Sequence, residues 1–492
     1  METSNEMAPG IAQDLRIRPD EKRASRREGE SSAPARLASL PEWAFCATAV
    51  LAPLPFGSAE PFWAGVWCTV LALAIAGSGA RRIERPVRLM IAAVLGVVAL
   101  WVVVVVLQYA PEVWGRGANP AWTQASRLLG RPLPAKIAAV AELPVGAVAA
   151  PLSLVLALLA GLLFGADRAC TGRLFAWVGY AGLAYAGYAI VTEIVSPTTL
   201  LWHEKTAYVN NLTGTFVNKN TAATFFGSIA IVWYVLTIRQ IRRVFDLTRL
   251  RSTAYLLHKL RTVRYRDMRY LLYFIVVLGC VLMTKSRAGA LLTIACLALM
   301  TVMYFARELR RGPHAALAVA AIALIGAVVL EIIGGGIAHQ VDIKGLTDGA
   351  RFQVYRSVLE IVAQHPWLGT GFGTFETVFP SYRTAAIGDW GLWDRAHSTP
   401  LELMAEMGLP FSAAMLALWG GVLGFALLAA VRRRRDRAEV IAGAAVGLLG
   451  TLHSLVDFSL QIPGYSIVCC ALLGSAIATA TASGSDGRRS GE

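Results

Sequence analysis

The chain has 492 residues, of which 56% are hydrophobic and only 16% are charged, and its mean hydropathy is +0.54. Soluble domains are about 45–50% apolar and about 25% charged, so this composition excludes an ordinary soluble protein and indicates a polytopic membrane protein. The net charge of +14 does not indicate a nucleic-acid partner, because the basic residues occur in clusters between apolar segments.

The two ends of the chain differ in composition from its body. The first 40 residues are polar and rich in Arg, Glu, Ser and Pro, without an apolar core. We therefore expect a disordered cytoplasmic tail rather than a signal peptide or a domain. Residues 41–482 form the predicted transmembrane domain, and residues 483–492 form a second cytoplasmic tail. The seven cysteines lie in apolar segments or short basic loops without metal-ligand spacing, so we expect neither a disulfide nor a metal site.

About a dozen apolar stretches have the length of roughly 17–25 residues that a membrane-spanning helix needs. We therefore predict an all-α membrane protein with about 12 transmembrane helices. The first stretch is the weakest, because Pro53 and Pro55 interrupt it. The predicted spans are, in order, 43–58, 62–79, 88–108, 149–166, 173–194, 220–238, 269–285, 288–306, 315–334, 411–431, 438–456 and 464–482.

Alternate loops between these spans are basic, which predicts their orientation. With this number of spans the basic loops all fall on one side together with both termini, as the positive-inside rule expects for the cytoplasm. The loop from Arg239 to Arg269 is the most basic of them. It predicts either an amphipathic helix on the anionic inner leaflet or a plain topology signal. The other basic loops contain Arg81 to Arg88, Arg168 and Arg173, Arg307 to Arg311, and Arg432 to Arg435.

The loops on the opposite side are longer and less basic. They run from about 108 to 148, from 196 to 219, and from 335 to 410. The third is nearly neutral, with Lys and Arg balanced by Asp and Glu, so it can be translocated. We predict that it is a periplasmic active-site loop that carries short amphipathic helices.

The pattern of the 335–410 loop predicts its local structure. We expect a helix that Asp348 caps, that ends before Pro366, and that packs through a stripe of Phe352, Tyr355, Leu359 and Val362. Arg351 then projects from the first turn, either toward a ligand or as a solvated surface arginine. The glycines between 369 and 373 follow no strand, so they favour a turn over a dinucleotide site.

Two further charged positions stand out in this loop and beside it. His397 precedes a helix that begins near Leu401, with Ser398 or Thr399 as its cap, and an imidazole there can accept a proton near neutral pH. A lone histidine is also often structural. Arg287 lies between two spans on the outer side, where positive charge is disfavoured. We expect it either to bind an anionic ligand or to snorkel to lipid phosphates.

Polar residues also mark other span ends. Asn218, Lys219 and Asn220 begin the span after the 196–219 loop, where amides suit sugar hydroxyls or phosphate and where Asn218 can equally cap the helix. His453 and Asp457 have the spacing of a pair within one helix. None of these charged residues is clearly mid-membrane, which argues against an ion-coupled transporter.

Several motifs together resemble the O-antigen ligase and polysaccharide polymerase family of bacterial inner-membrane proteins. The resemblance covers roughly residues 45 to 480. The motifs are Gly-Thr-Phe-Val-Asn-Lys-Asn (214–220), Ser-Arg-Ala-Gly (286–289), Arg351, His-Pro-Trp-Leu-Gly-Thr-Gly-Phe-Gly-Thr-Phe (365–375), Ala-His-Ser-x-x-Leu-Glu-x-x-x-Glu-x-Gly (396–408) and Leu-His-Ser-Leu-Val-Asp-Phe (452–458).

This resemblance implies a metal-independent, inverting glycosyl transfer of the GT-C type at the periplasmic face, without a cofactor. The donor is a glycan on undecaprenyl diphosphate, and the acceptor is lipid A core or a growing polysaccharide. His397 handles the acceptor proton. The family usually has Asn after this histidine, whereas this chain has Ser398. The expected diphosphate ligands are Arg287 and Arg351, with Lys219 and Arg395, and the expected sugar contacts are Asn218, Asn220 and Tyr355.

The alternatives within the family are an exopolysaccharide polymerase and a protein O-oligosaccharyltransferase. Outside the family, the alternatives are a membrane transporter and a structural membrane partner. A transporter predicts charged residues in the middle of the membrane and no large outer loop. The expected location is the bacterial inner membrane, with several spans.

Overall fold

The computed structural model describes residues 40–79, 81, 83–111, 117–244, 253–262, 264–309, 346–387, 392–433 and 437–482. These residues are mostly helical, and the strands β1 (Thr199–Leu200) and β2 (His203–Glu204) form a short antiparallel hairpin. The predicted span 315–334 and the tails 1–39 and 483–492 lie outside the described residues.

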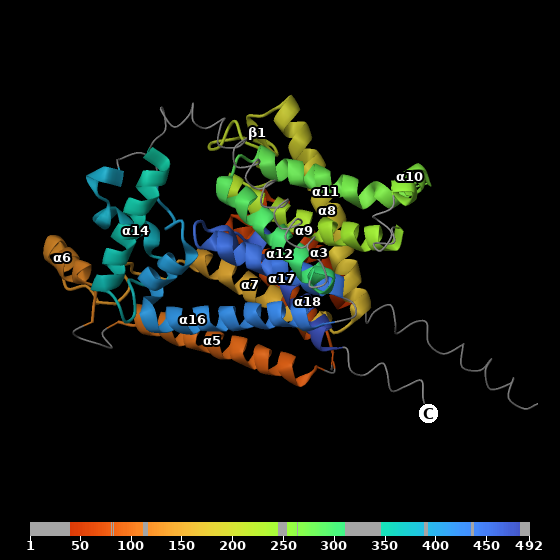
Figure 1. Cartoon of the computed structure of the whole chain (residues 1–492). Helices are drawn as coiled ribbons and strands as arrows, with labels where there is room; N and C mark the ends of the chain where they lie inside the picture. Colours follow the sequence, from red (N-terminus) through yellow and green to blue (C-terminus); the bar gives the residue numbers. More distant parts are fainter. Residues whose placement is uncertain are drawn as a thin grey trace, which may run out of the picture. The chain divides into compact units, whose positions relative to one another are not determined.

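The long helices follow the predicted spans closely (Figure 1). The described part begins with α3, which ends at Leu51, just before the two prolines that made the first span doubtful. These helices are α3 (Leu40–Leu51), α4 (Pro61–Ala76), α5 (Arg85–Tyr109), α7 (Val145–Phe164), α8 (Arg168–Val195), α9 (Lys219–Val244), α11 (Tyr265–Met283), α12 (Arg287–Leu309), α16 (Thr399–Arg432), α17 (Arg437–Ser454) and α18 (Pro463–Thr481).

Seven of the described helices are long and apolar enough to cross a membrane: α5, α7, α8, α9, α12, α16 and α18. The helices α3, α4 and the apolar part of α11 are shorter. The chain is therefore a polytopic helical membrane protein, whereas the number of 12 spans stays a prediction.

The helices α9 and α18 form the centre of the bundle. In each, 89% of the most apolar window is buried inside the protein, against 11% in α5 and 22% in α16. Helices that are apolar all round and covered by other helices lie inside, whereas α5 and α16 present apolar side chains outward, as helices facing lipid do. Small residues permit close packing at the centre: a Cβ on Gly474 of α18 would lie 2.6 Å from the carbonyl oxygen of Leu158 in α7.

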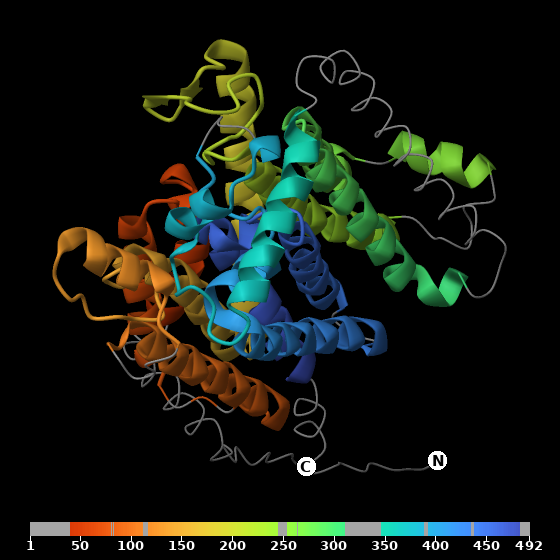
Figure 2. The ribbon, with the colours of Figure 1, turned by 90° about the vertical axis from the view of Figure 1, so that its left-hand side faces the viewer.

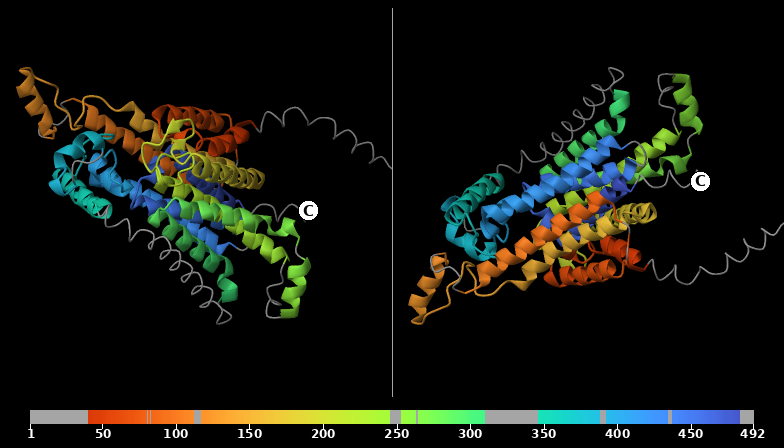
Figure 3. Two further views of the ribbon diagram at one scale, coloured as in Figure 1. Left: turned by 90° about the horizontal axis from the view of Figure 1, so that it is seen from above. Right: turned by 90° about the horizontal axis from the view of Figure 1, so that it is seen from below.

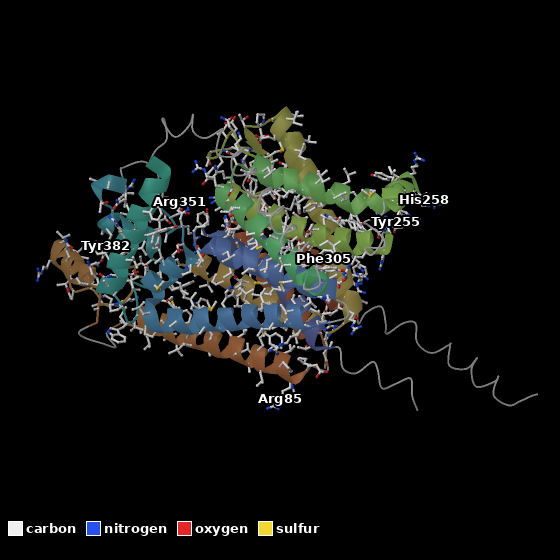
Figure 4. All side chains as sticks on the ribbon, in the orientation of Figure 1. Arg85, Tyr255, His258, Phe305, Arg351 and Tyr382 are labelled. Carbon is white, nitrogen blue, oxygen red and sulfur yellow. The ribbon has the colours of Figure 1, made fainter. Side chains whose placement is uncertain are left out.

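The predicted basic loops meet at one end of the bundle. Arg81 and Arg173 both bind Glu42 of α3, at 2.8 and 2.5 Å. Arg242 and Arg437 both lie over the ring of Tyr304 in α12. Figure 4 shows Arg85, His258 and Phe305 at the end away from Arg351 and Tyr382. The helix α10 (Thr253–Thr262), from the 239–269 loop, extends from this basic end (Figure 3).

The opposite end carries the described part of the 335–410 loop (Figure 2). This part of the loop has its own small core. The helix α14 (Leu346–Gln364) lies across the ends of the bundle helices and packs on the short helices α15 (Phe375–Val378), η3 (Phe379–Tyr382) and η4 (Ala385–Ile387). Valines and isoleucine of α14 bury against Phe375, Phe379 and Ala405.

Two details predicted for α14 are wrong. The helix already includes Leu346, so Asp348 lies within it rather than at its cap. The buried face consists of Val354, Val358, Ile361 and Val362, so the predicted stripe is right at Val362, whereas Phe352 and Leu359 are 68% and 52% exposed. The face that packs against the loop core is the adjacent face of the same helix, which carries the β-branched residues. The periodicity of apolar residues alone does not distinguish the two faces.

The loop returns to the membrane through a kink in α16. This helix begins at Thr399, two residues before the predicted start, and continues through the 411–431 span to Arg432. Ser398 occupies the cap position, as predicted for Ser398 or Thr399, but its side chain makes no capping hydrogen bond. Gly408 has φ +77°, and the amide of Leu409 donates to the carbonyl of Pro366 instead of continuing the helix. The three glycines of the 369–373 turn also have positive φ, and the buried Glu406 carboxylate accepts the amides of Gly373 and Phe375. The kink therefore docks the loop onto the bundle.

Candidate functional site

The centre of the site is Asp457, in the connection between α17 and α18. Its carboxylate accepts the amide of Phe458 at 2.7 Å and a short hydrogen bond from the side chain of Asn220. The same carboxylate lies 3.9 Å from Arg351 and 3.8 Å from the Nδ1 atom of His397. Only 2% of its side-chain surface is exposed. One buried carboxylate therefore joins residues from α9, α14 and the start of α16.

His397 is held by aromatic rings on two sides. Its ring lies edge-on to Trp393 and Phe458, with centroid distances of 5.3 and 5.0 Å. Its backbone has φ +52°, a conformation rare in residues with a side chain, and the hydroxyl of Tyr355 donates to its carbonyl at 2.9 Å. Nδ1 is buried without a hydrogen bond. Strained backbone held by surrounding contacts is typical of functional positions.

The protonation states follow from burial. Burial lowers the pKa of His397 to about 4, and the positive charge of Arg351 adds to this shift. Burial raises the pKa of Asp457, whereas the Phe458 amide, Arg351 and the Asn220 side chain oppose the rise. The distance of 3.8 Å is longer than a hydrogen bond. We therefore describe this contact as a neutral imidazole facing a carboxylate whose charge Arg351 and two N–H donors stabilise.

The polar residues at the start of α9 lie in the same cluster. The side chain of Asn218 accepts the amide of Asn220, so it caps the helix. The side chain of Asn220 binds Asp457 through its NH₂ group and accepts the hydroxyl of Ser286 at 2.8 Å through its oxygen. Both ends of this amide thus bind protein groups, so Asn220 connects Asp457 to Ser286.

Arg287 and Lys219 are neighbours of these residues. Arg287 is exposed and begins α12 directly after Ser286. Lys219 precedes Asn220, and its ammonium group donates to the carbonyl of Lys285 at 3.3 Å. The chain Ser286–Asn220–Asp457–Arg351 therefore links the segments that carry the expected cations. In Figure 4, Arg351 lies between α14 and the ends of the bundle helices.

Arg395 lies at the edge of the cluster. It donates to Gln461 at 3.0 Å and lies 3.5 Å from Glu402, whose other oxygen accepts the amide of Ala396 at 2.8 Å. Glu402 therefore holds the backbone next to His397, and Arg395 ties the loop to the α17–α18 connection. His397, Arg351, Asn218, Asn220 and Tyr355 are joined by these contacts, whereas Arg287 and Lys219 are next to the cluster along the chain.

One polar contact differs from the sequence expectations, and three acidic residues of the site were not recognised from the sequence. His453 binds the hydroxyl of Ser459 at 2.9 Å and does not pair with Asp457. The central role of Asp457 was missed because its partners come from distant helices. The sequence analysis did not recognise that Glu402 and Glu406 bind backbone amides of the loop. Both occur in the 396–408 motif, and their spacing of four residues on the C-terminal side of His397 was a signal.

Fold and site together define the class: a polytopic helical membrane protein with a cationic, histidine-containing site at the end opposite its basic loops. Residues 272–411 match the family described as O-Antigen ligase. This match supports an O-antigen ligase or Wzy-type family for the segment and, in general terms, an O-antigen ligase or polymerase-like function. The match begins within α11 and includes α12 and the loop up to the kink of α16. A search of curated proteins finds no match to this chain.

Proposed function

We propose that the chain is a glycosyltransferase that moves a glycan from undecaprenyl diphosphate to an acceptor hydroxyl at the periplasmic face of the bacterial inner membrane. The observation that carries this proposal is the convergence of His397 and Arg351 on the buried Asp457. This convergence places a neutral base, His397, near a fixed cation, Arg351. Direct displacement of a diphosphate needs both, the base for the acceptor proton and the cation for the leaving group. The 12-span, GT-C-like architecture belongs to the same proposal.

In the proposed reaction the acceptor hydroxyl attacks the anomeric carbon while His397 takes up its proton. The bond between the anomeric carbon and the phosphate oxygen breaks, and the diphosphate leaves with the electron pair. A single displacement inverts the anomeric configuration. Asp457 then lies 3.8 Å from the imidazolium that forms, where its charge stabilises it.

Cations take the place of a general acid for the leaving group. Arg351 and Arg287 are the proposed diphosphate ligands, with Lys219 and Arg395 at the edges, because a guanidinium matches phosphate oxygens in shape and charge. Tyr355 and Asn218 remain proposed sugar contacts. Lipid A core and a growing polysaccharide are the proposed acceptors.

The test is His397→Ala in full-length protein at normal membrane level. We expect glycan transfer to fall by about 10²–10⁴-fold, the usual contribution of a general base, so that lipid-linked glycan accumulates. His258→Ala, in the exposed helix α10 at the other end, is the matched control and should transfer at the wild-type rate. Transfer by His397→Ala at the wild-type rate would contradict the assignment.

A further inference from the structure

Tyr208 lies in the outer loop between α8 and α9, beside the proposed diphosphate site. The ammonium group of Lys219 lies over its ring, 5.7 Å from the centroid. The charges of Asp457, Arg351 and Asp394 act on its hydroxyl. The ring thus lies next to Lys219, and the hydroxyl is within the electrostatic range of Arg351; both cations are proposed ligands of the donor.

The backbone around Tyr208 is held in an unusual conformation. Its φ is +57°, and its carbonyl accepts the amide of Asn211 in a tight turn. Lys285, itself at φ +54°, donates from its ammonium group to the carbonyl of Asn210 at 2.8 Å. Left-handed backbone in residues with a side chain is strained and persists where surrounding contacts enforce it. The turn before Arg287 therefore fixes the position of Tyr208.

The phenol remains a hydrogen-bond donor at neutral pH. Burial raises the pKa of Tyr208, the charges of Asp457 and Asp394 add to the rise, and Arg351 opposes it. A neutral phenol can donate to an anionic oxygen without bringing a further charge into the cluster.

We propose that Tyr208 is a further substrate-binding residue, whose hydroxyl donates a hydrogen bond to the diphosphate of the donor between Lys219 and Arg351. This inference rests on the proposed function. It adds to the cations a neutral donor from a loop outside the 272–411 family match. It also gives the 196–218 loop a role as one wall of the donor site.

The experiment measures binding of inorganic pyrophosphate to full-length protein in lipid nanodiscs. We expect Tyr208→Phe to weaken binding by about 10- to 100-fold, because hydrogen bonds to charged groups contribute about 1.5–3 kcal/mol and each 1.4 kcal/mol is tenfold. The same variant should raise the KM for the lipid-linked donor and leave the KM for the acceptor unchanged.

Tyr188→Phe is the matched control. The hydroxyl of Tyr188 accepts the amide of Leu201 at 2.8 Å, so its loss loosens the same loop away from the site. Equal weakening in both variants would assign the effect to the loop and overturn the proposal. Binding by Tyr208→Phe within twofold of wild type would also overturn it. If wild-type protein itself does not bind pyrophosphate, the proposed diphosphate site fails, and not Tyr208 alone.

Discussion

Asp457 shows how one buried carboxylate organises residues that are distant in the sequence. Removing a carboxylate from water is costly unless donors replace the lost hydration. Here the Phe458 amide, the Asn220 side chain and Arg351 supply them. The arrangement leaves His397 neutral beside a negative charge, which is the state that a proton acceptor needs.

The low pKa of His397 predicts the acid limb of the pH profile. Because the folded protein keeps the imidazole neutral down to about pH 4, kcat/KM should fall with a midpoint below the ordinary value of about 6.5. Arg351→Gln removes one cause of the shift and should move the midpoint upward. The measurement is the pH dependence of kcat/KM for both proteins; a wild-type midpoint at or above 6.5 would contradict the assigned environment.

The same shift has a defined sign for stability. The unfolded chain binds a proton on His397 near pH 6.5, whereas the folded protein does so only near pH 4. The unfolded state therefore holds more protons between these values, and this residue lowers the free energy of unfolding as the pH falls through the window.

At the scale of elements, the kink of α16 joins the loop to the membrane helix. A Cβ on Gly408 would lie 2.3 Å from the carbonyl oxygen of Trp367. Its φ of +77° is also unfavourable for any residue with a side chain. The kink positions the second turn of α16 against the 366–375 turn, whose amides donate to the Ala405 carbonyl and to the carbonyl and carboxylate of Glu406.

We therefore expect Gly408→Ala to lower the free energy of unfolding by more than about 1–3 kcal/mol, the strain of a left-handed residue alone. Gly420→Ala in the same helix is the control. A Cβ there meets nothing within 4 Å, so this change should be neutral or stabilising by up to about 1 kcal/mol. Thermal unfolding in detergent measures the stability of both variants. Equal Tm values for the two variants would contradict the prediction that the kink requires glycine at position 408.

At the scale of the whole molecule, the basic loops lie at one end of the bundle and the candidate site at the other. This separation fits a protein whose basic end remains in the cytoplasm. In the proposed function the site end faces the periplasm, where the proposed prenyl-anchored sugar diphosphate reaches Arg351 from the outer leaflet.

Labelling of single introduced cysteines tests this topology. Ser381 and His258 are both exposed and lie in the site-end loop and in α10. The seven native cysteines are all buried, which limits background labelling. In intact cells with a permeable outer membrane, an impermeant maleimide should label Ser381→Cys, and should label His258→Cys only after the inner membrane is broken. The opposite pattern would place the site in the cytoplasm.

The sequence by itself determined the class of fold, and it predicted the side chains that we propose for the site. Apolar segments of membrane-spanning length reveal helices because every backbone polar group in lipid must be satisfied within the helix. The positions of α7, α8 and α9 were predictable for this reason. His397, Arg351 and Arg287 were recognisable because charged residues at span ends are unusual enough to need an explanation.

Only the tertiary structure decided which residues meet. The contact of Asp457 with His397 joins two connections 60 positions apart, and the Asn220–Ser286 contact joins two helices; local patterns carry no information on such distances. The face that α14 buries was likewise undetermined by periodicity, because two adjacent faces are apolar and the packing partners select one. Spacing along the chain describes single helices, whereas a site built from several helices depends on how their buried polar groups satisfy one another.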